Sequence, residues 1–433
     1  RISPENKRKI ASCVARNDVL YKSASFFEKM YPGPLKAIHA TRDACHGTAC
    51  TDCMPTQGVL NLTDICNYRC AFCEIHHVHE KIPVKYKNII DLDVLKKYEC
   101  WIQHLSSLNF YGSVGEPMIN PHFVEIAAYL KEKFPRLNLS VNTNGFFLEP
   151  GTADALIRCG FDNILVSMHA ADKETYQKLL GGNFDRVVSN IRYFTSRKGR
   201  GSRLGINFML NRLNAHNTRS IIDFACEYNL DYISVNSYYD VRNKLSRDVS
   251  YYFDPAEGNR LLDEIYHYAR ERNVTLTPSQ PCYYHAMEDV NAIDPDHLTS
   301  EGDRYCLQPW RLVQFKGALD YPDSHYVSVC NRLEPLLINY KNFFSGPDNS
   351  FHDIWNHKVI QFLRETVNSP RPNLICRLCR SREYRIVRCL DNEKYRQLRD
   401  QAVQDFFVQF KKRYGSAHNS IKGLRLYEET PYR

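Results

Sequence analysis

The chain of 433 residues lacks any long apolar segment. No run approaches the roughly eighteen uninterrupted apolar residues that indicate a membrane-spanning helix. The N-terminal residues are charged and lack an apolar core followed by a cleavage site for secretion. Lys/Arg-rich runs with interleaved aromatic residues are also missing, so a net charge of +8 does not indicate nucleic-acid binding. We therefore expect a cytoplasmic protein with neither a membrane nor a nucleic acid among its partners.

Cysteine, in contrast, is abundant, with 16 in the chain. Disulfides are rare in cytoplasmic proteins, so these thiols need another explanation. Cys100, Cys159 and Cys226 stand alone in helix-like segments, where we expect them to pack in the core as small apolar side chains. Most of the others form groups, and those groups are candidates for metal sites.

Short apolar segments alternate with amphipathic ones over residues 56–280. Strands are expected at 58–62, 108–112, 137–145, 163–170, 203–210, 231–239 and 274–278. Helices are expected at 92–105, 121–134, 152–160, 184–198, 218–229 and 255–273. This alternation predicts an α/β protein, a partial (β/α)6 barrel of the TIM type with its active site at the carboxyl ends of the strands.

The pattern changes near residue 280, where helical periodicity fades and cysteines return. We divide the chain into an N-terminal extension with cysteines (1–55), the barrel (56–280), a loop-rich domain (281–390) and a C-terminal helix and tail (391–433). The C-terminal helix is expected to be amphipathic and exposed.

The stretch CNYRCAFC places Cys66, Cys70 and Cys73 directly after the first predicted strand. A structural zinc site usually takes four protein ligands. Three thiolates on one loop instead leave one iron of a 4Fe–4S cluster without a protein ligand, and that open iron can bind another molecule.

The C-x3-C-x2-C spacing, with the aromatic Phe72 before the third cysteine, resembles the radical S-adenosylmethionine (SAM) superfamily. The resemblance implies that SAM binds the open iron and that the reduced cluster cleaves it to a 5′-deoxyadenosyl radical. This radical would abstract a hydrogen atom from the substrate. An electron donor such as flavodoxin or ferredoxin is implied as a partner.

Later segments resemble the SAM-binding segments of the same superfamily. Gly115, Glu116 and Pro117 match the end of its Gly-Gly-Glu-Pro segment, with Val114 in place of the first glycine. The resemblance implies that they bind the SAM amino group. A glycine allows close backbone approach, and oxygen acceptors suit an ammonium.

Three further residues are expected cofactor contacts by the same resemblance. SVNTNG (140–145) contributes Asn142, VSMHA (166–170) contributes Ser167, and INFML (206–210) contributes Asn207. For Asn207 a satisfied polar group inside the barrel is an equal alternative. His169 stands where many relatives carry an acid, so it marks either substrate specificity or nothing.

Cysteines beyond residue 300 stand in two pairs, Cys306 with Cys330 and Cys376 with Cys379. With Trp310 and the DIWN and FLRE stretches, they resemble the SPASM/twitch extension of radical SAM enzymes. The resemblance implies one auxiliary 4Fe–4S cluster that the four thiolates fully ligate. Zinc is the alternative for four cysteines in two pairs.

A third group, Cys45, Cys50 and Cys53, precedes the first strand. Residues that enter the strand should lie at the amino end of the barrel, roughly 20 Å from the first cysteine loop at about 3.3 Å per residue. That favours a structural or electron-relay role, and a third cluster and unligated thiols are both left open. Candidate fourth ligands are Cys13, His46, Cys282 and Cys389.

We expect a small-molecule substrate such as a sugar, an aminocyclitol or a nucleoside-like metabolite, in natural-product (antibiotic) biosynthesis. Oxidation, epimerisation and elimination are the candidate reactions, and Cys282 is a candidate hydrogen donor for epimerisation. The alternative is a peptide maturase that forms thioether or carbon–carbon crosslinks. Residues 1–55 look too short and too cysteine-rich for its usual leader-binding module. His76, His77 and His79 are interpreted as surface or pocket-lining residues.

Overall fold

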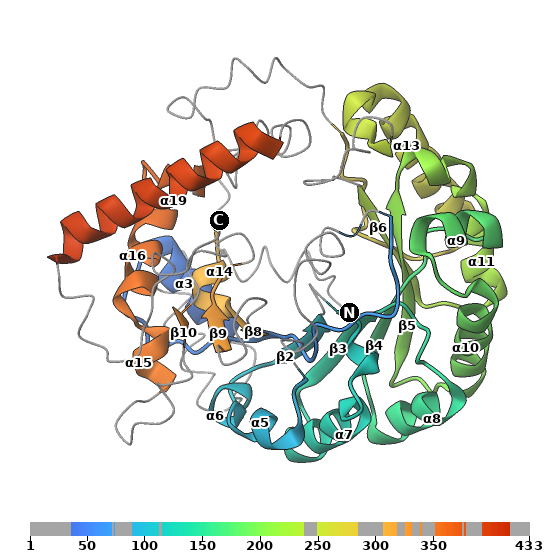
Figure 1. The fold of residues 1–433 in the computed structure, drawn as a ribbon, viewed down its shortest axis with the longest axis horizontal. Coiled ribbons are helices and arrows are strands. Elements are labelled where there is room, and N and C mark those ends of the chain that lie inside the picture. The colour runs from blue at the N-terminus through green and yellow to red at the C-terminus, as the bar shows by residue number, and fades with distance from the viewer. Residues whose placement is uncertain are drawn as a thin grey trace.

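The computed structural model describes the chain over residues 36–71, 73, 89–111, 115–237, 249–284, 306–317, 325–330, 338–339, 351–374, 376–377 and 392–415. One curved sheet of ten strands organises these residues (Figure 1). Its strand order is β10-β9-β8-β1-β2-β3-β4-β5-β6-β7.

Seven neighbouring strands of this sheet run parallel and follow chain order. They are β1 (Gln57–Leu60), β2 (Ser107–Tyr111), β3 (Asn138–Thr143), β4 (Asn163–Ser167), β5 (Arg203–Leu210), β6 (Tyr232–Ser237) and β7 (Leu276–Thr277). Every predicted strand has its counterpart here. The expected α/β fold with an open, partial barrel is therefore confirmed.

Helices cover the outer face of the sheet (Figure 1). They are α5 (Leu92–Lys96), α6 (Glu99–Ile102), α7 (Phe123–Lys133), α8 (Pro150–Cys159), α9 (Lys173–Leu180), α10 (Phe184–Arg197), α11 (Ser220–Glu227) and α13 (Pro255–Glu271). The helix expected at 92–105 is divided into α5 and α6, and α9 was not expected. Asp172 caps the start of α9 by accepting from the Thr175 amide at 2.8 Å, and Gly181 ends it with a φ of +64°.

Side chains alternate across the strands, as a half-buried sheet requires. Val141 on β3, Val166 on β4 and Ile206 on β5 are fully buried beneath the helices. Their neighbours Asn142, Ser167 and Asn207 point to the other face and are half-buried. The inner face of the barrel therefore carries polar side chains on β3, β4 and β5.

The C-terminal region continues the same sheet. β8 (Leu312–Gly317) pairs in parallel with β1, so that Gln57 lies opposite Leu312. β9 (His325–Ser328) and β10 (Ile338–Asn339) follow as antiparallel strands. Short helices α14 (Gln308–Arg311), α15 (Phe351–Trp355) and α16 (Lys358–Val367) complete this region.

The C-terminal helix α19 (Asn392–Tyr414) was expected, but the expectation that it is exposed is wrong. Phe406, Phe407 and Phe410 are buried, and the Phe406 ring lies 5.0 Å from the Phe362 ring of α16. The helix therefore has one packed face. In the part of the chain that the structure describes, no helix has the length and apolarity to cross a membrane.

The three isolated cysteines differ from one another. Cys159 on α8 is half-buried against the core, and Cys226 on α11 is half-buried. Cys100 on α6 is exposed, so its expected place in the core is wrong. The helical segment that carries it is short, and only the neighbouring Trp101 and Ile102 face inward.

Candidate functional site

The cysteine loop leaves the carboxyl end of β1. The Sγ of Cys66 accepts a hydrogen bond from the Tyr68 amide at 3.4 Å, and the Cys73 amide donates to the Cys70 carbonyl at 3.1 Å. Burial raises the pKa of Cys66 to about 11. Burial, followed by the charges of Cys73 and Cys66, raises the pKa of Cys70 even further. Cys66 and Cys73 therefore both lie close enough to Cys70 to oppose its ionisation.

The donor chemistry of this loop fits an iron–sulfur cluster. The surroundings of Cys66 and Cys70 favour the protonated thiols, whereas iron stabilises thiolates directly. The loop offers three thiols and faces the open end of the barrel. Phe72 and the histidines His76, His77 and His79 lie outside the described residues.

Gly115 brings the segment after β2 into direct contact with the cysteine loop. A Cβ at this position would collide with the Thr63 carbonyl oxygen and lie 2.9 Å from the Ile65 carbonyl oxygen. The Glu116 amide donates to the same Ile65 carbonyl at 2.8 Å. Only glycine allows this approach. The expected contact of Gly115 with SAM stays a prediction.

Glu116 connects this segment to the end of β3. It is 2% exposed, and its carboxylate accepts from the Thr143 hydroxyl and the Asn144 amide, both at 2.6 Å. The Met118 amide donates a third bond at 3.1 Å, at the start of a short turn of 3-10 helix (Pro117–Ile119) in which Pro117 is buried. Burial nevertheless raises the Glu116 pKa to about 7.

Asn144 extends the connection back to the cysteine loop. Its side-chain amide donates to the Asn67 Oδ1 at 2.8 Å. The loop of Cys66–Cys73, the Glu116 segment and the β3 terminus therefore form one hydrogen-bonded unit. Sequence reasoning missed Asn67 and Asn144, although both lie inside the motifs that it used.

The expected SAM contacts on the inner face lie side by side. Ser167 and Asn207 are register partners on β4 and β5, and Asn142 occupies the same face of β3. The Asn236 side chain on β6 donates to Asn207 Oδ1 at 2.6 Å. Asn207 is thus both exposed to the barrel interior and hydrogen-bonded there. Asn236 was missed, although it follows the period-two alternation of β6.

His169, by contrast, is not accessible. It is 3% exposed, and its Nδ1 accepts from the Met209 amide at 3.2 Å. Burial lowers the His169 pKa to about 4, so the imidazole is neutral. Its carbonyl accepts from the Asn214 side chain at 2.8 Å. Of the two interpretations left open for His169, its position favours a structural role that joins the ends of β4 and β5.

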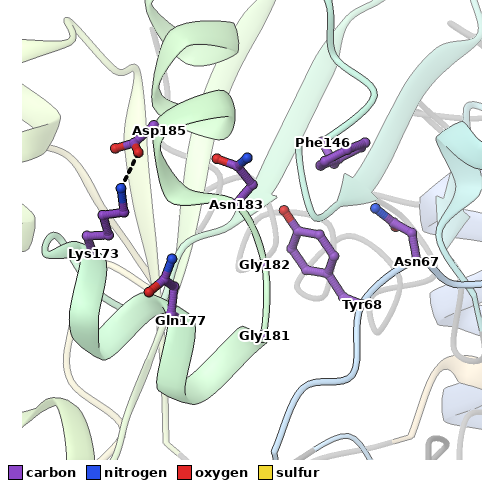
Figure 2. A pocket seen from close by; sticks show the side chains of 9 residues that line it. All are labelled: Asn67, Tyr68, Phe146, Lys173, Gln177, Gly181, Gly182, Asn183 and Asp185. Carbon is purple, nitrogen blue, oxygen red and sulfur yellow. Dashed lines mark hydrogen bonds and ion pairs between the residues drawn. The ribbon is translucent and has the colours of Figure 1, made fainter.

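A cavity of about 460 Å³ lies beside the cysteine loop (Figure 2). Tyr68 and Phe146 form one wall, with ring centroids 6.1 Å apart, and the Gly181–Gly182 turn forms another. A Cβ on Gly182 would collide with the Tyr68 ring. The Ala71 amide also donates to the Leu179 carbonyl at 2.9 Å, so α9 supports the cysteine loop. No sequence signal pointed to this cavity.

Cys282 is exposed at the carboxyl end of β6, where Ser237 Oγ donates to its carbonyl at 3.4 Å. This is the end of the sheet from which the cysteine loop also leaves. Its role as a hydrogen donor stays a prediction. This position excludes Cys282 as the fourth ligand of the group Cys45, Cys50 and Cys53. That group precedes β1 and therefore lies at the amino end of the sheet.

The C-terminal cysteines lie toward the amino end of the barrel. Cys306 precedes β8, which runs parallel to β1, and Cys330 follows the antiparallel β9. Both are half-buried, and Cys376 is 7% exposed. The side chain of Cys45 and residues Cys379 and Cys389 lie outside the described part. Among the described side chains, no three metal-binding groups converge on one ion.

The comparison with known proteins agrees with the cysteine loop and the sheet. Residues 60–225 match the family described as the radical SAM superfamily. The part of the chain from β1 to α11 therefore resembles the radical SAM superfamily. Its cofactors are accordingly SAM and a 4Fe–4S cluster.

Curated relatives resemble only part of this radical SAM protein. A probable GTP 3′,8-cyclase of Saccharolobus islandicus (strain L.S.2.15 / Lassen #1) is 35% identical over 136 residues, 31% of this chain and 41% of that protein. A probable GTP 3′,8-cyclase of Metallosphaera sedula is 29% identical over 175 residues, 40% of this chain and 52% of that protein. The matched region thus covers about half or less of the length of each relative.

Solved structures show a longer likeness in fold. SuiB of Streptococcus suis, bound to S-adenosylmethionine, has a TM-score of 0.52 at 14% identity and covers 89% of this chain and 88% of its own. Native anSMEcpe with bound AdoMet has a TM-score of 0.52 at 16% identity, over 85% of this chain and 100% of its own. The shared fold therefore reaches beyond the barrel into the region of the expected SPASM/twitch extension.

Proposed function

We propose that this radical SAM enzyme abstracts a hydrogen atom from a small polar molecule, such as a sugar, an aminocyclitol or a nucleoside-like metabolite. The observation that carries the proposal is the inner face of the barrel. Apart from the three expected SAM contacts, the hydroxyls of Ser140 and Ser234 and the amide of Asn236 line it. These groups both donate and accept hydrogen bonds and carry no charge, which suits a hydroxyl-rich neutral substrate.

The residues that would hold the cofactors lie around the open end of the barrel. Cys66, Cys70 and Cys73 would ligate the cluster, and bound SAM would supply the radical that removes the hydrogen atom. Gly115 would bring backbone acceptors close to the SAM amino group, while Glu116 and Pro117 hold that segment in place. Asn142, Ser167 and Asn207 would orient the remainder of SAM from the inner face.

The C-terminal cysteines support the choice of reaction. We assign Cys306, Cys330, Cys376 and Cys379 to an auxiliary 4Fe–4S cluster. Such a cluster can accept the second electron when a substrate radical is oxidised, which favours oxidation. Epimerisation would instead need a hydrogen donor, and Cys282 at the end of β6 is the candidate.

A peptide substrate is the second candidate. Its support is the likeness in fold to SuiB, which was also solved bound to precursor peptide SuiA with a TM-score of 0.51. At 15% identity this likeness concerns the fold alone. The partial GTP 3′,8-cyclase relatives are named for a nucleotide and favour the first candidate.

Isotope transfer distinguishes the two substrate classes. The reconstituted protein would be incubated with SAM, dithionite and fully deuterated sugars, aminocyclitols, nucleosides or peptides. Deuterium in 5′-deoxyadenosine, measured by mass spectrometry, identifies the substrate that loses the hydrogen atom. Transfer from a small molecule supports the proposal, and transfer from peptides alone rejects it. The Cys66→Ala protein is the control and should form no labelled product.

A further inference from the structure

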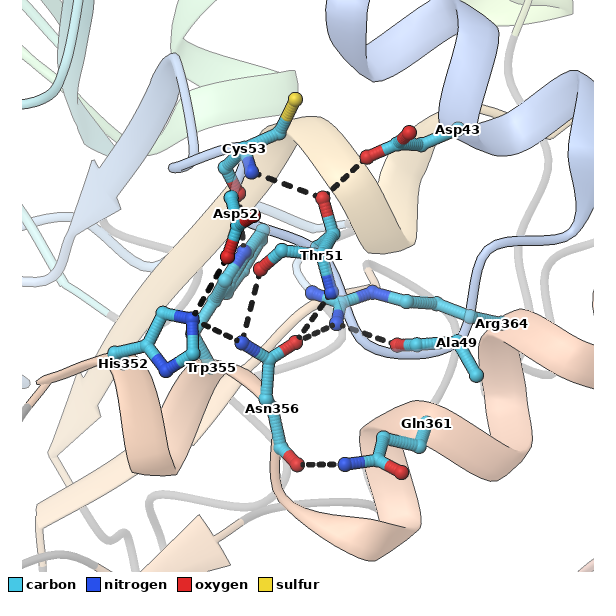
Figure 3. A network of polar contacts seen from close by, with 10 residues as sticks. All are labelled: Asp43, Ala49, Thr51, Asp52, Cys53, His352, Trp355, Asn356, Gln361 and Arg364. Atoms are coloured by element: carbon cyan, nitrogen blue, oxygen red, sulfur yellow. Dashed lines mark hydrogen bonds and ion pairs between the residues drawn. The ribbon is translucent and has the colours of Figure 1, made fainter.

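The segment between α3 (Lys36–His46) and β1 is hydrogen-bonded to the C-terminal region (Figure 3). The bonded residues lie 262 to 315 positions apart in the chain. Side-chain donors of that region bind four carbonyl groups of the segment. They are Trp310 Nε1 to Thr48 at 2.9 Å, Arg364 Nη1 to Ala49 at 3.0 Å, Asn356 Nδ2 to Thr51 at 2.9 Å and Trp355 Nε1 to Cys53 at 2.7 Å.

These contacts fix the turn Cys50-Thr51-Asp52-Cys53 in one conformation. The Thr51 amide also donates to Asn356 Oδ1 at 2.9 Å, so both backbone groups of Thr51 are bound by one side chain. The Cys53 amide donates to Thr51 Oγ1 at 2.9 Å, and this hydroxyl in turn donates to Asp43. The turn that carries Cys50 and Cys53 therefore has a fixed conformation before any ligand binds.

A buried guanidinium lies against this turn. Arg364 is fully buried, and its Nε and Nη1 donate to the carbonyls of Pro309 and Ala49. Its Nη2 is buried and has no hydrogen-bond partner among the described residues. Its Nη1 also donates to Asn356 Oδ1 at 2.8 Å, the same oxygen that accepts from the Thr51 amide between Cys50 and Cys53. A buried cation with a spare donor needs an anionic partner, since an unpaired one is strongly destabilising.

We propose that Cys50 and Cys53 are thiolate ligands of an iron–sulfur cluster and that Arg364 is the buried counter-charge of this cluster. A cluster bound by thiolates is anionic, and its sulfur atoms accept hydrogen bonds from nearby donors. Arg364 Nη2 is such a donor. The site is distinct from the cysteine loop after β1 and does not depend on the substrate proposed above.

Asn368 joins two other segments of this region that carry cysteines. Asn368 Nδ2 donates to the Ala44 carbonyl at 3.1 Å and to the Cys306 carbonyl at 3.0 Å. Cys45 follows Ala44 in α3. Asn368 thus holds the end of α3 beside the segment that carries Cys306.

Iron analysis tests the proposal on the full chain. In a Cys66→Ala/Cys70→Ala/Cys73→Ala background, iron and acid-labile sulfide report only the other clusters. Adding Cys50→Ala and Cys53→Ala should lower both quantities per chain, by about four iron atoms for a cubane. The matched control adds Cys159→Ala and Cys226→Ala and should leave both unchanged. The proposal is overturned if the iron and sulfide contents equal those of the triple-variant parent. It is also overturned if the parent contains zinc and no labile sulfide.

Arg364 supplies a second readout if the double cysteine variant fails to fold. Removing a positive charge near a cluster makes its reduction potential more negative. Arg364→Gln should therefore shift one EPR-monitored potential downward in the same background, whereas Arg364→Lys should keep it closer to the parent value. A purely structural role would lower the melting temperature in both variants and leave the potential in place, which would overturn the assignment. Variants of Cys306 and Cys330 test the auxiliary cluster separately.

Discussion

The Glu116 carboxylate accepts a 2.6 Å hydrogen bond from the backbone amide of Asn144, which connects the loop after β2 to the end of β3. Because Asn144 also contacts Asn67, the same bond supports the cysteine loop. Glu116 is thus positioned to hold the cysteine loop, the loop after β2 and the end of β3 together.

Replacing Glu116 with Gln should weaken this unit. The amide oxygen can replace one carboxylate oxygen, but the NH2 group would then face a backbone amide or a hydroxyl donor. An unsatisfied buried donor costs about 1–3 kcal/mol. We expect a melting temperature several degrees lower and weaker SAM binding by calorimetry. Unchanged SAM affinity would show that Glu116 does not position the cofactor.

Gly115→Ala should disrupt the approach of this segment to the cysteine loop, since the added methyl group collides with the Thr63 carbonyl. We expect reduced iron content after reconstitution and a loss of stability of about 1–3 kcal/mol, the usual range for overpacking. Gly199→Ala is the matched control, because a Cβ there meets nothing within 4 Å. Equal iron content in the two variants would contradict the proposed contact.

His169 should make the stability of the protein depend on pH. Its pKa is about 4 in the folded state, against 6.5 as the ordinary value. The unfolded chain therefore binds more protons between these values, and stability falls as the pH drops from 6.5 toward 4. The full effect is about 3 kcal/mol at most.

His169→Asn isolates this contribution, because the Asn oxygen can still accept from the Met209 amide. The difference in unfolding free energy between the two proteins should change over this pH range. The comparison is needed because Glu116, with its pKa raised to about 7, has the opposite effect. Its stabilising contribution is lost as the pH rises from 4.5 to 7. A constant difference between pH 7 and pH 4 would refute the prediction.

Cys66→Ala should abolish 5′-deoxyadenosine formation, since two thiolates do not hold a cluster with one open iron. Chromatography of the acid-quenched reaction with SAM and dithionite measures the product. Cys100→Ala, at an exposed site on α6, is the control and should retain the parent level. Product formation by the Cys66 variant at the parent rate would exclude the loop as the cluster site.

Local patterns predicted the barrel well, because each strand and helix shows its own periodicity. A close backbone approach at Gly115 was expected toward SAM, whereas the approach that the structure shows is to the carbonyls of Thr63 and Ile65. The pairing of β8 with β1 and the packing of α19 on α16 were not predictable. In both cases the partner lies far away in the chain, and no local pattern identifies it. The attachment of residues 48–53 to Arg364 and Asn356 was missed for the same reason.

The pairing of β1 with β8 also bears on how the molecule can be shortened or assembled. Gln57 and Leu312 are neighbours in the sheet although they are distant in sequence, so this contact forms only after most of the chain is available. A fragment that ends near residue 280 would leave the β1 edge without its partner strand. Exposed edges of this kind recruit other chains, so such a fragment is expected to aggregate even though it contains every strand from β1 to β7.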